Sequence, residues 1–181
     1  MAHESSSDDR AESSDLARGV VEALMARTGE ASPKPRLHAT RRVVELLGDP
    51  QRMFGVIHLA GTNGKTSTAR MIDSLLRAHG LRVGLMTSPH LHVLNERIVI
   101  DGRPISDQAL ADNWADVEPF ITMVDAELVA NAEPPLTYFE ALTVLTLAAF
   151  ADAPVDIAVI EAGMGGEWDS TNVVDADVAV L

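Results

Sequence analysis

The sequence predicts an α/β fold in which helices flank a mostly parallel sheet, and three observations indicate it. Short apolar runs typical of buried strands occur at residues 56–60, 82–87 and 156–161. Segments with apolar residues at helical spacing separate these runs, which favours parallel pairing through right-handed crossovers. A glycine-rich turn with a lysine follows the first run, and such strand-to-helix turns commonly bind phosphate groups.

The residues before the first strand predict a tail and two helices. Residues 1–14 are rich in Ser, Asp and Glu, so we expect a disordered tail there and one domain over residues 15–181. Apolar side chains at helical spacing predict a helix over residues 15–27. A second helix is expected to end at Gly48, where an Asp-Pro pair follows.

The glycine-rich turn predicts a P-loop-type nucleotide site. The generic P-loop pattern requires glycine at position 59, where this chain has Leu59, so the motif is the shorter sequence GTNGKT before a helix over residues 68–79. Its glycines direct backbone N–H groups inward, and Lys65 adds a positive charge. An incidental lysine in an ordinary turn is the alternative, but turn chemistry does not require a lysine and two hydroxyls at a helix start. The candidate nucleotide ligands are Gly61, Thr62, Asn63, Gly64, Lys65, Thr66 and Ser67.

Two further strands place candidate magnesium ligands at the same edge of the sheet. The strand over residues 82–87 is followed by Ser88, and the strand over residues 156–161 ends on Glu161. Because ligands collect beyond the carboxyl ends of parallel strands, we expect both side chains to lie beside Lys65. Magnesium prefers hard oxygen ligands, which a hydroxyl, a carboxylate and a phosphate supply. Taken separately, Ser88 also fits a turn cap, and Glu161 also fits a solvated strand end.

The middle of the chain predicts a hairpin insertion and a long helical segment. An Asp-Gly pair between apolar runs at residues 97–105 indicates a hairpin, and Pro104 puts its returning arm at the sheet edge. Helical spacing resumes over residues 110–128, where Pro119 either kinks one helix or begins a second.

The last third predicts a helix and a final strand. Thr137 and Glu140 stand at capping-box spacing at the start of a helix over residues 137–149, so they fit helix capping as well as ligand binding. Residues 176–181 have the pattern of a buried strand, and the sequence stops within it. We therefore expect the chain to be the front part of something longer.

Composition and single residues exclude several classes of site. The net charge of −13 argues against a nucleic-acid or acidic-membrane partner. The sequence has no cysteine, no apolar run of membrane-spanning length and an acidic start, so we expect a cytoplasmic protein without disulfides or thiolate metal sites. His58 and Trp114 are interpreted as core residues. His90 and His92 would face opposite sides of an extended segment, which argues against a two-histidine metal site.

Several segments resemble, in order, those of the folylpolyglutamate synthase/dihydrofolate synthase family, which is related to the Mur ligases of cell-wall synthesis. The resemblance extends over about residues 36–181. The segments are GTNGK at 61–65, TSPHL at 87–91, NERI at 95–98, TYFE at 137–140, and EAGMGG at 161–166 with DSTNV at 169–173.

The resemblance implies an ATP-dependent ligase. The γ-phosphate of ATP would pass to a carboxylate of folate or dihydropteroate, and the amine of L-glutamate would attack the acyl phosphate. Lys65 and Glu161 would be the catalytic residues, and Ser88 and Glu161 would bind Mg²⁺. The pterin pocket would be lined by Thr137, Tyr138, Phe139, Glu140, Trp168, Asp169 and Ser170, and, where the match is poor, by residues 34–37. A monomer with these small-molecule partners is expected.

Departures from the family leave alternatives open. Thr66 stands where many relatives have glycine and is closer to the Mur-ligase form, and Glu167 stands where arginine is common. The family's later histidine, its modified lysine and its second α/β domain would lie beyond Leu181, so the ATP-binding domain is expected to be incomplete. A Mur-type ligase and a nucleotide-binding module without ligase activity remain as alternatives. Glutamate-dependent phosphate release separates the module from a ligase, and the motifs do not separate dihydropteroate from a reduced folate.

Overall fold

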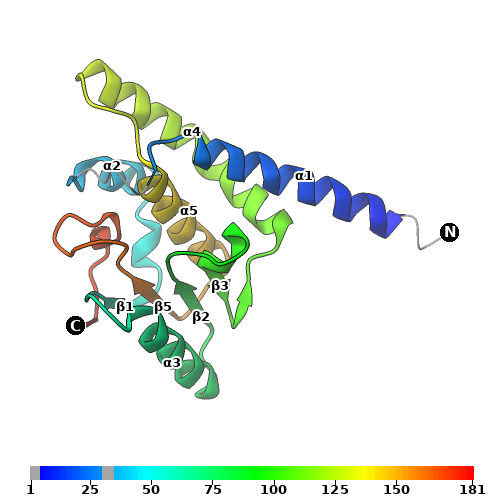
Figure 1. Cartoon of the computed structure of the whole chain (residues 1–181), viewed down its shortest axis with the longest axis vertical. Coiled ribbons are helices and arrows are strands. Elements are labelled where there is room, and N and C mark those ends of the chain that lie inside the picture. Colours follow the sequence, from blue (N-terminus) through cyan, green and yellow to red (C-terminus); the bar gives the residue numbers. More distant parts are fainter. Residues whose placement is uncertain (1–4, 30–34) are drawn as a thin grey trace.

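The computed structural model of the chain describes residues 5–29 and 35–181 and has a six-stranded sheet at its centre (Figure 1). The strand order is β4-β3-β2-β5-β1-β6. The four strands β2, β5, β1 and β6 are parallel, and β3 and β4 add antiparallel partners at one edge. The strands are β1 (Gly55–Leu59), β2 (Val83–Met86), β3 (Ile98–Ile100), β4 (Arg103–Pro104), β5 (Ile157–Glu161) and β6 (Val178–Val180). The predicted mostly parallel sheet with a hairpin insertion is confirmed.

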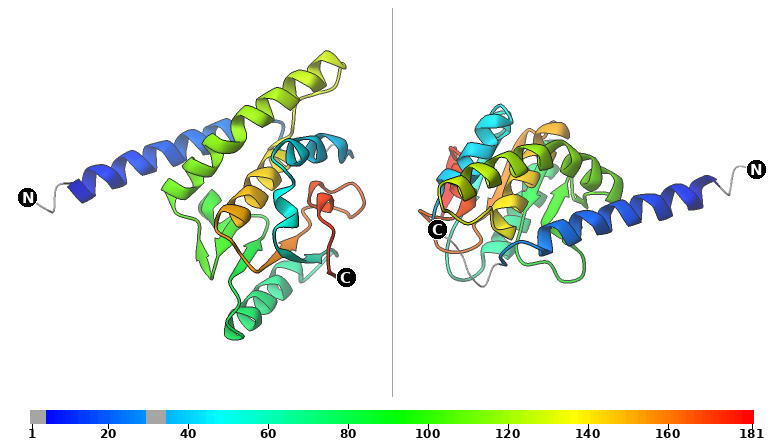
Figure 2. Two further views of the ribbon diagram at one scale, coloured as in Figure 1. Left: turned by 180° about the vertical axis from the view of Figure 1, so that it is seen from behind. Right: turned by 90° about the horizontal axis from the view of Figure 1, so that it is seen from above.

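Helices cover both faces of the sheet (Figures 1 and 2). One face is covered by α3, whose Ala69 packs in a small core with Leu59, Leu85 and other strand residues. The larger core on the other face is shared by the remaining helices, and most residues of α5 are buried because it lies between the sheet and the outer helices. The helices are α1 (Ser5–Met25), α2 (His38–Leu46), α3 (Lys65–Ala78), α4 (Asp107–Ala130) and α5 (Tyr138–Asp152).

The register of the parallel strands aligns the loops that form the candidate site. Leu59, the last residue of β1, pairs with Glu161, the last residue of β5. On the other side of β5, Met86 pairs with Ile160, so Thr87 and Ser88 follow at the height of Glu161. The glycine-rich turn at residues 61–66, called the phosphate loop from here on, therefore leaves the sheet at the same edge as Ser88 and Glu161, as the crossover rule predicts.

Two predicted segments differ in the structure. Helix α1 starts at Ser5, where the sequence predicts a disordered tail over residues 1–14; residues 1–4 lie outside the described residues. It is anchored farther along by Ala17, Val20 and Leu24, and its first turns extend away from the remaining molecule (Figures 1 and 2). The predicted buried strand at the end is β6, an edge strand in which Val178 is 49% exposed. Among the described residues it pairs with β1 and with no second strand.

The structure also tests the predictions made for the two prolines, the capping box and Trp114. Helix α4 is a single helix that contains Pro119, and β4, which contains Pro104, is the edge strand. Thr137 and Glu140 form the predicted capping box, and Trp114 is buried. Within the described residues, no helix combines the length and the apolar character needed to cross a membrane.

Candidate functional site

A cavity of about 480 Å³ lies at the carboxyl edge of the sheet. Its wall combines the start of α3, the ends of β2 and β5, the start of α5 and the glycine-rich loop after β5. The lining residues are Gly29, Arg36, Lys65, Ser88, Pro89, Thr137, Phe139, Glu140, Glu161, Gly163, Met164, Trp168, Asp169 and Ser170. Segments far apart in the sequence thus contribute to one cavity.

The phosphate loop presents the N-terminus of α3 to this edge. Gly61 and Gly64 have φ of 138° and 77°, in the left-handed region that side chains disfavour. Gly64 is the N-cap of α3, so no side chain caps the first N–H groups of the helix. The Lys65 Nζ donates a 2.9 Å hydrogen bond to the Gly61 carbonyl, which folds the ammonium group over the loop. Free helix N–H groups beside an ammonium make an anion site.

Glu161 is the centre of a cluster of oxygen atoms. Its carboxylate is buried and accepts hydrogen bonds from the Thr66 hydroxyl at 2.8 and 2.9 Å and from the Ser88 N–H at 3.3 Å. A carboxylate with two hydroxyl-bearing neighbours is a hard donor set of the kind that Mg²⁺ accepts, with phosphate and water oxygens completing its shell. Within the described residues no group of three or more His, Cys, Asp or Glu could hold a metal. The donors that are present fit a magnesium ion that is also bound to phosphate oxygens.

A buried ion pair forms the wall opposite the phosphate loop. The Arg36 guanidinium donates to both carboxylate oxygens of Glu140 at 2.9 and 3.0 Å, and to the carbonyls of Pro134 and Pro135. Arg36 is 9% exposed and Glu140 is 4% exposed. The hydrogen bonds to Glu140 hold the pKa of Arg36 above its ordinary value. Glu140 also accepts from the Thr137 N–H, so one carboxylate serves both the helix cap and the ion pair.

We expect Glu140→Ala to lower the free energy of unfolding by about 2 kcal/mol. The change leaves Arg36 buried without its carboxylate, which costs about 3–5 kcal/mol in fully buried pairs, but the two proline carbonyls still accept from it. The matched control is Glu127→Ala, because the Arg42–Glu127 pair is exposed and an ion pair in water contributes little to stability. Urea unfolding followed by tryptophan fluorescence measures both; equal losses would show that burial of the Glu140 pair is unimportant.

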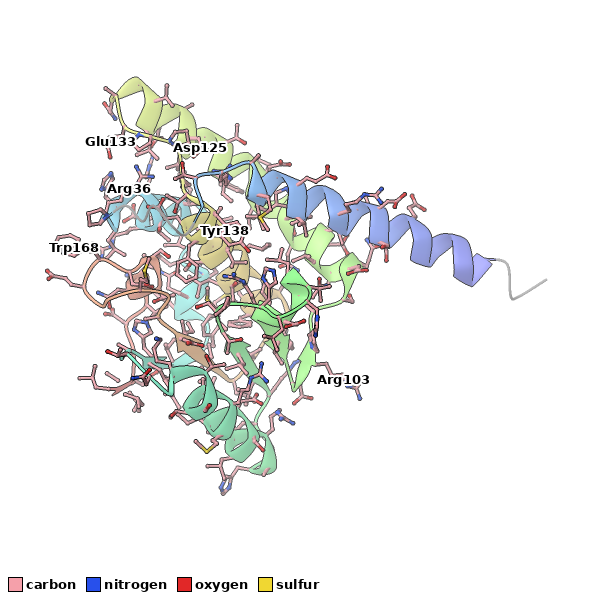
Figure 3. The ribbon with its side chains drawn as sticks, viewed as in Figure 1. Arg36, Arg103, Asp125, Glu133, Tyr138 and Trp168 are labelled. Carbon is pink, nitrogen blue, oxygen red and sulfur yellow. The ribbon has the colours of Figure 1, made fainter. Side chains whose placement is uncertain are left out.

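The third side of the cavity is apolar and aromatic. A Cβ atom on Gly163 would lie 2.6 Å from the Phe139 ring, so only glycine lets the loop after β5 pack against that ring. Met164 and Trp168 are 55% exposed and lie on the same wall, and Figure 3 shows Trp168 at the outer side of this loop. These side chains provide flat apolar surface for a planar ring.

Residues 59–181 match the family described as the Mur ligase middle domain. The chain belongs to the Mur ligase middle domain family. Among its relatives, the dihydrofolate synthase/folylpolyglutamate synthase of Mycobacterium tuberculosis is 48% identical over 165 residues, which are 90% of this chain and 34% of that protein. The folylpolyglutamate synthase of Lacticaseibacillus casei is 44% identical over 153 residues, 81% of this chain and 35% of that protein. This Mur ligase middle domain thus spans about a third of the length of these relatives.

Solved structures share the fold. The Mycobacterium tuberculosis folylpolyglutamate synthase complexed with ADP matches with a TM-score of 0.86 and 46% identity, over 92% of this chain and 36% of that chain. Escherichia coli FolC in complex with DHPP and ADP matches with a TM-score of 0.77 and 32% identity, over 90% of this chain and 37% of that chain. ADP is therefore a ligand of two proteins that contain a domain with this fold.

Most of the predicted site residues of this Mur ligase middle domain come together. Those that line the cavity are Lys65, Ser88, Thr137, Phe139, Glu140, Glu161, Trp168, Asp169 and Ser170. Thr66 reaches the site through its hydrogen bonds to Glu161. Gly61, Thr62, Asn63, Gly64 and Ser67 belong to the adjoining loop and first turn of α3, outside the described lining.

Tyr138 is the predicted pocket residue that faces elsewhere. It is buried, its ring centroid lies 5.3 Å from the Arg97 guanidinium carbon, and it lines a separate cavity beside α1 (Figure 3). Successive residues of a helix point about 100° apart, so Tyr138 and Phe139 have different neighbours. Tyr138 thus does not line this cavity, and its place in a pterin pocket stays a prediction.

Some lining residues were not singled out from the sequence. Arg36 was included only in the poorly matching segment 34–37, of which Lys34 lies outside the described residues. Gly29 and Pro89 carried no chemical signal, whereas Gly163 and Met164 lie in the glycine-rich motif after β5. His90, one of the two histidines of the TSPHL region, accepts a 2.8 Å hydrogen bond from Arg97 at its Nδ1.

Proposed function

We propose that this chain forms the ATP-binding portion of a ligase that adds L-glutamate to folate or dihydropteroate through an acyl phosphate. One observation carries the proposal: a single cavity joins the Lys65 loop, the Glu161 oxygen cluster and an aromatic wall. The likeness to synthases of this type supports it, including the complex of the Escherichia coli protein with DHPP and ADP. The chain would use ATP and Mg²⁺.

The polar side of the cavity would hold the nucleotide phosphates. Lys65 and the N–H groups at the start of α3 would bind the phosphate oxygens, in the manner of other helix N-termini. Glu161, Ser88 and Thr66 would hold Mg²⁺. When bound, this ion neutralises charge on the β- and γ-phosphates. Hydrogen bonds from Thr66 and Ser88 fix the Glu161 carboxylate beforehand, so little reorganisation is needed on binding.

The opposite side would hold the acid substrate. Phe139, Met164 and Trp168 offer apolar surface to a pterin ring, and Arg36 and Glu140 keep the start of α5 in place. A ring held there would extend its carboxylate along the cavity toward Lys65 and the γ-phosphate. Holding the carboxylate beside the phosphate raises the effective concentration of the two reactants. This proximity would be the main source of the rate enhancement.

ADP formation by the natural protein that contains this chain tests the proposal. With Mg·ATP and dihydropteroate, ADP should form only when L-glutamate is added, and omission of Mg²⁺ should stop it. ATP binding without glutamate-dependent ADP formation would leave a nucleotide-binding module. Preference for a uridine-nucleotide-linked acid over dihydropteroate would indicate a Mur-type ligase instead.

A further inference from the structure

A line of hydrogen bonds runs from the central strand β1 to the wall of the cavity. The His58 Nε2 lies 2.8 Å from the Thr171 hydroxyl, which in turn donates to the Asp169 carboxylate. Asp169 also accepts from the Thr171 N–H at 3.0 Å and, with its other oxygen, from the Met164 N–H at 2.7 Å. Thr171 is fully buried and Asp169 is 6% exposed. The line therefore crosses the interior and ends on the glycine-rich loop.

The donor and acceptor properties of Asp169, Thr171 and His58 decide which group donates in each of these hydrogen bonds. The Thr171 hydroxyl has one hydrogen, and that hydrogen goes to Asp169, because an ionised carboxylate only accepts. The Thr171 oxygen must then accept from His58, so His58 carries its proton on Nε2 and leaves Nδ1 without one. Burial lowers the pKa of His58, which keeps the ring neutral at neutral pH, although Asp169 opposes this effect.

The His58 side chain is hydrogen-bonded toward the loop after β5, although its backbone lies close to the phosphate loop. Its backbone pairs with Ile160 in β5 and Ala179 in β6, and the phosphate loop begins three residues later, at Gly61. The side chain lies outside the described lining of the cavity, so it acts only through Thr171 and Asp169. Asp169 and Met164 do line the cavity, on the side assigned above to the pterin ring.

We propose that His58 is a positioning residue that, through Thr171 and Asp169, fixes the loop after β5 and sets the affinity for the pteroate-type acid but not for the nucleotide. The inference rests on the proposed function. The hydrogen bonds from His58 through Thr171 orient the Asp169 carboxylate, which in turn holds the backbone of the loop after β5 at Met164. Asp169 and Met164 would face the bound pterin ring. The phosphate side is held separately by Gly61, Lys65 and Glu161, so it is expected to be insensitive to the relay.

Two amide substitutions of His58 that differ only in side-chain length provide the test. Glutamine places its amide nitrogen near the position of Nε2 and can donate to Thr171, whereas asparagine is too short to do so. We expect His58→Asn and His58→Leu to weaken dihydropteroate binding about tenfold, the effect of one lost hydrogen bond at a half-buried site, and His58→Gln to restore it. The affinity for Mg·ATP should stay unchanged in all three. Isothermal titration of the natural protein that contains this chain measures both ligands.

Two variants of Thr171 and a nitrogen-15 spectrum of His58 test the same hydrogen bonds independently. Thr171→Ser keeps the hydroxyl and should bind dihydropteroate normally, whereas Thr171→Val should resemble His58→Asn. Nitrogen-15 spectra of the His58 ring should show a protonated Nε2 and a bare Nδ1. Equal binding in the Asn and Gln variants, equal loss for both ligands, or a proton on Nδ1 would overturn the inference. A natural protein that binds neither ligand would refute the proposed function itself.

Discussion

Lys65→Ala is expected to lower glutamate-dependent ADP formation about 100- to 1000-fold, the usual cost of removing one group that stabilises charge in a transition state. The ammonium group lies over the phosphate loop, within hydrogen-bond distance of the Gly61 carbonyl, and faces the cavity. This chain has a formal net charge of −13, which repels the nucleotide phosphates, so the local cation has a large share of the attraction. Initial rates of ADP formation at saturating substrates measure the effect.

Arg70→Ala is the matched control for Lys65. It removes the same charge from the same helix, but the Arg70 side chain lines a separate cavity beside the β3–β4 hairpin. We expect less than a twofold change in that variant. Normal turnover in Lys65→Ala, or equal losses in both variants, would remove the phosphate loop from the mechanism.

Glu161→Gln is expected to abolish the dependence of ATP binding on magnesium and to lower the ligase rate about 100-fold. Glutamine has nearly the same volume, so the packing at the end of β5 is retained. The amide carries no charge, and its NH₂ group can no longer accept from Thr66 and Ser88, as the second carboxylate oxygen does. Titration of ATP with and without MgCl₂ measures the effect directly.

Glu167→Gln is the control for Glu161. It removes the same charge from an exposed position in the loop after β5, outside the described lining of the cavity. We expect magnesium to strengthen ATP binding equally in this variant and in the unaltered chain. A Glu161→Gln protein that still responds fully to magnesium would place the ion elsewhere.

The convergence of the polar site could be predicted because it follows from local patterns and one topological rule. Apolar runs end where the strands end, and parallel pairing then brings Lys65, Ser88 and Glu161 to one edge. The hairpin followed in the same way from an Asp-Gly pair and Pro104. In each case the information lies within a few residues.

The features that were missed depend on distant partners. Arg36 pairs with Glu140, 104 residues away, and nothing near Arg36 in the sequence indicates this. Tyr138 belongs to a motif whose neighbours line the cavity, but the rotation of α5 turns its side chain toward Arg97.

The position of bound nucleotide is the most direct test of the central claim, that one edge of the sheet binds Mg·ATP beside the acid substrate. A crystal structure of the chain with AMPPCP and Mg²⁺ should place the terminal phosphates at Lys65 and the first turn of α3, with the ion bound to Glu161 and Ser88. Trp168 and Phe139 should remain clear of the nucleotide. Nucleotide bound away from Lys65, or an ion that does not contact Glu161, would contradict the account.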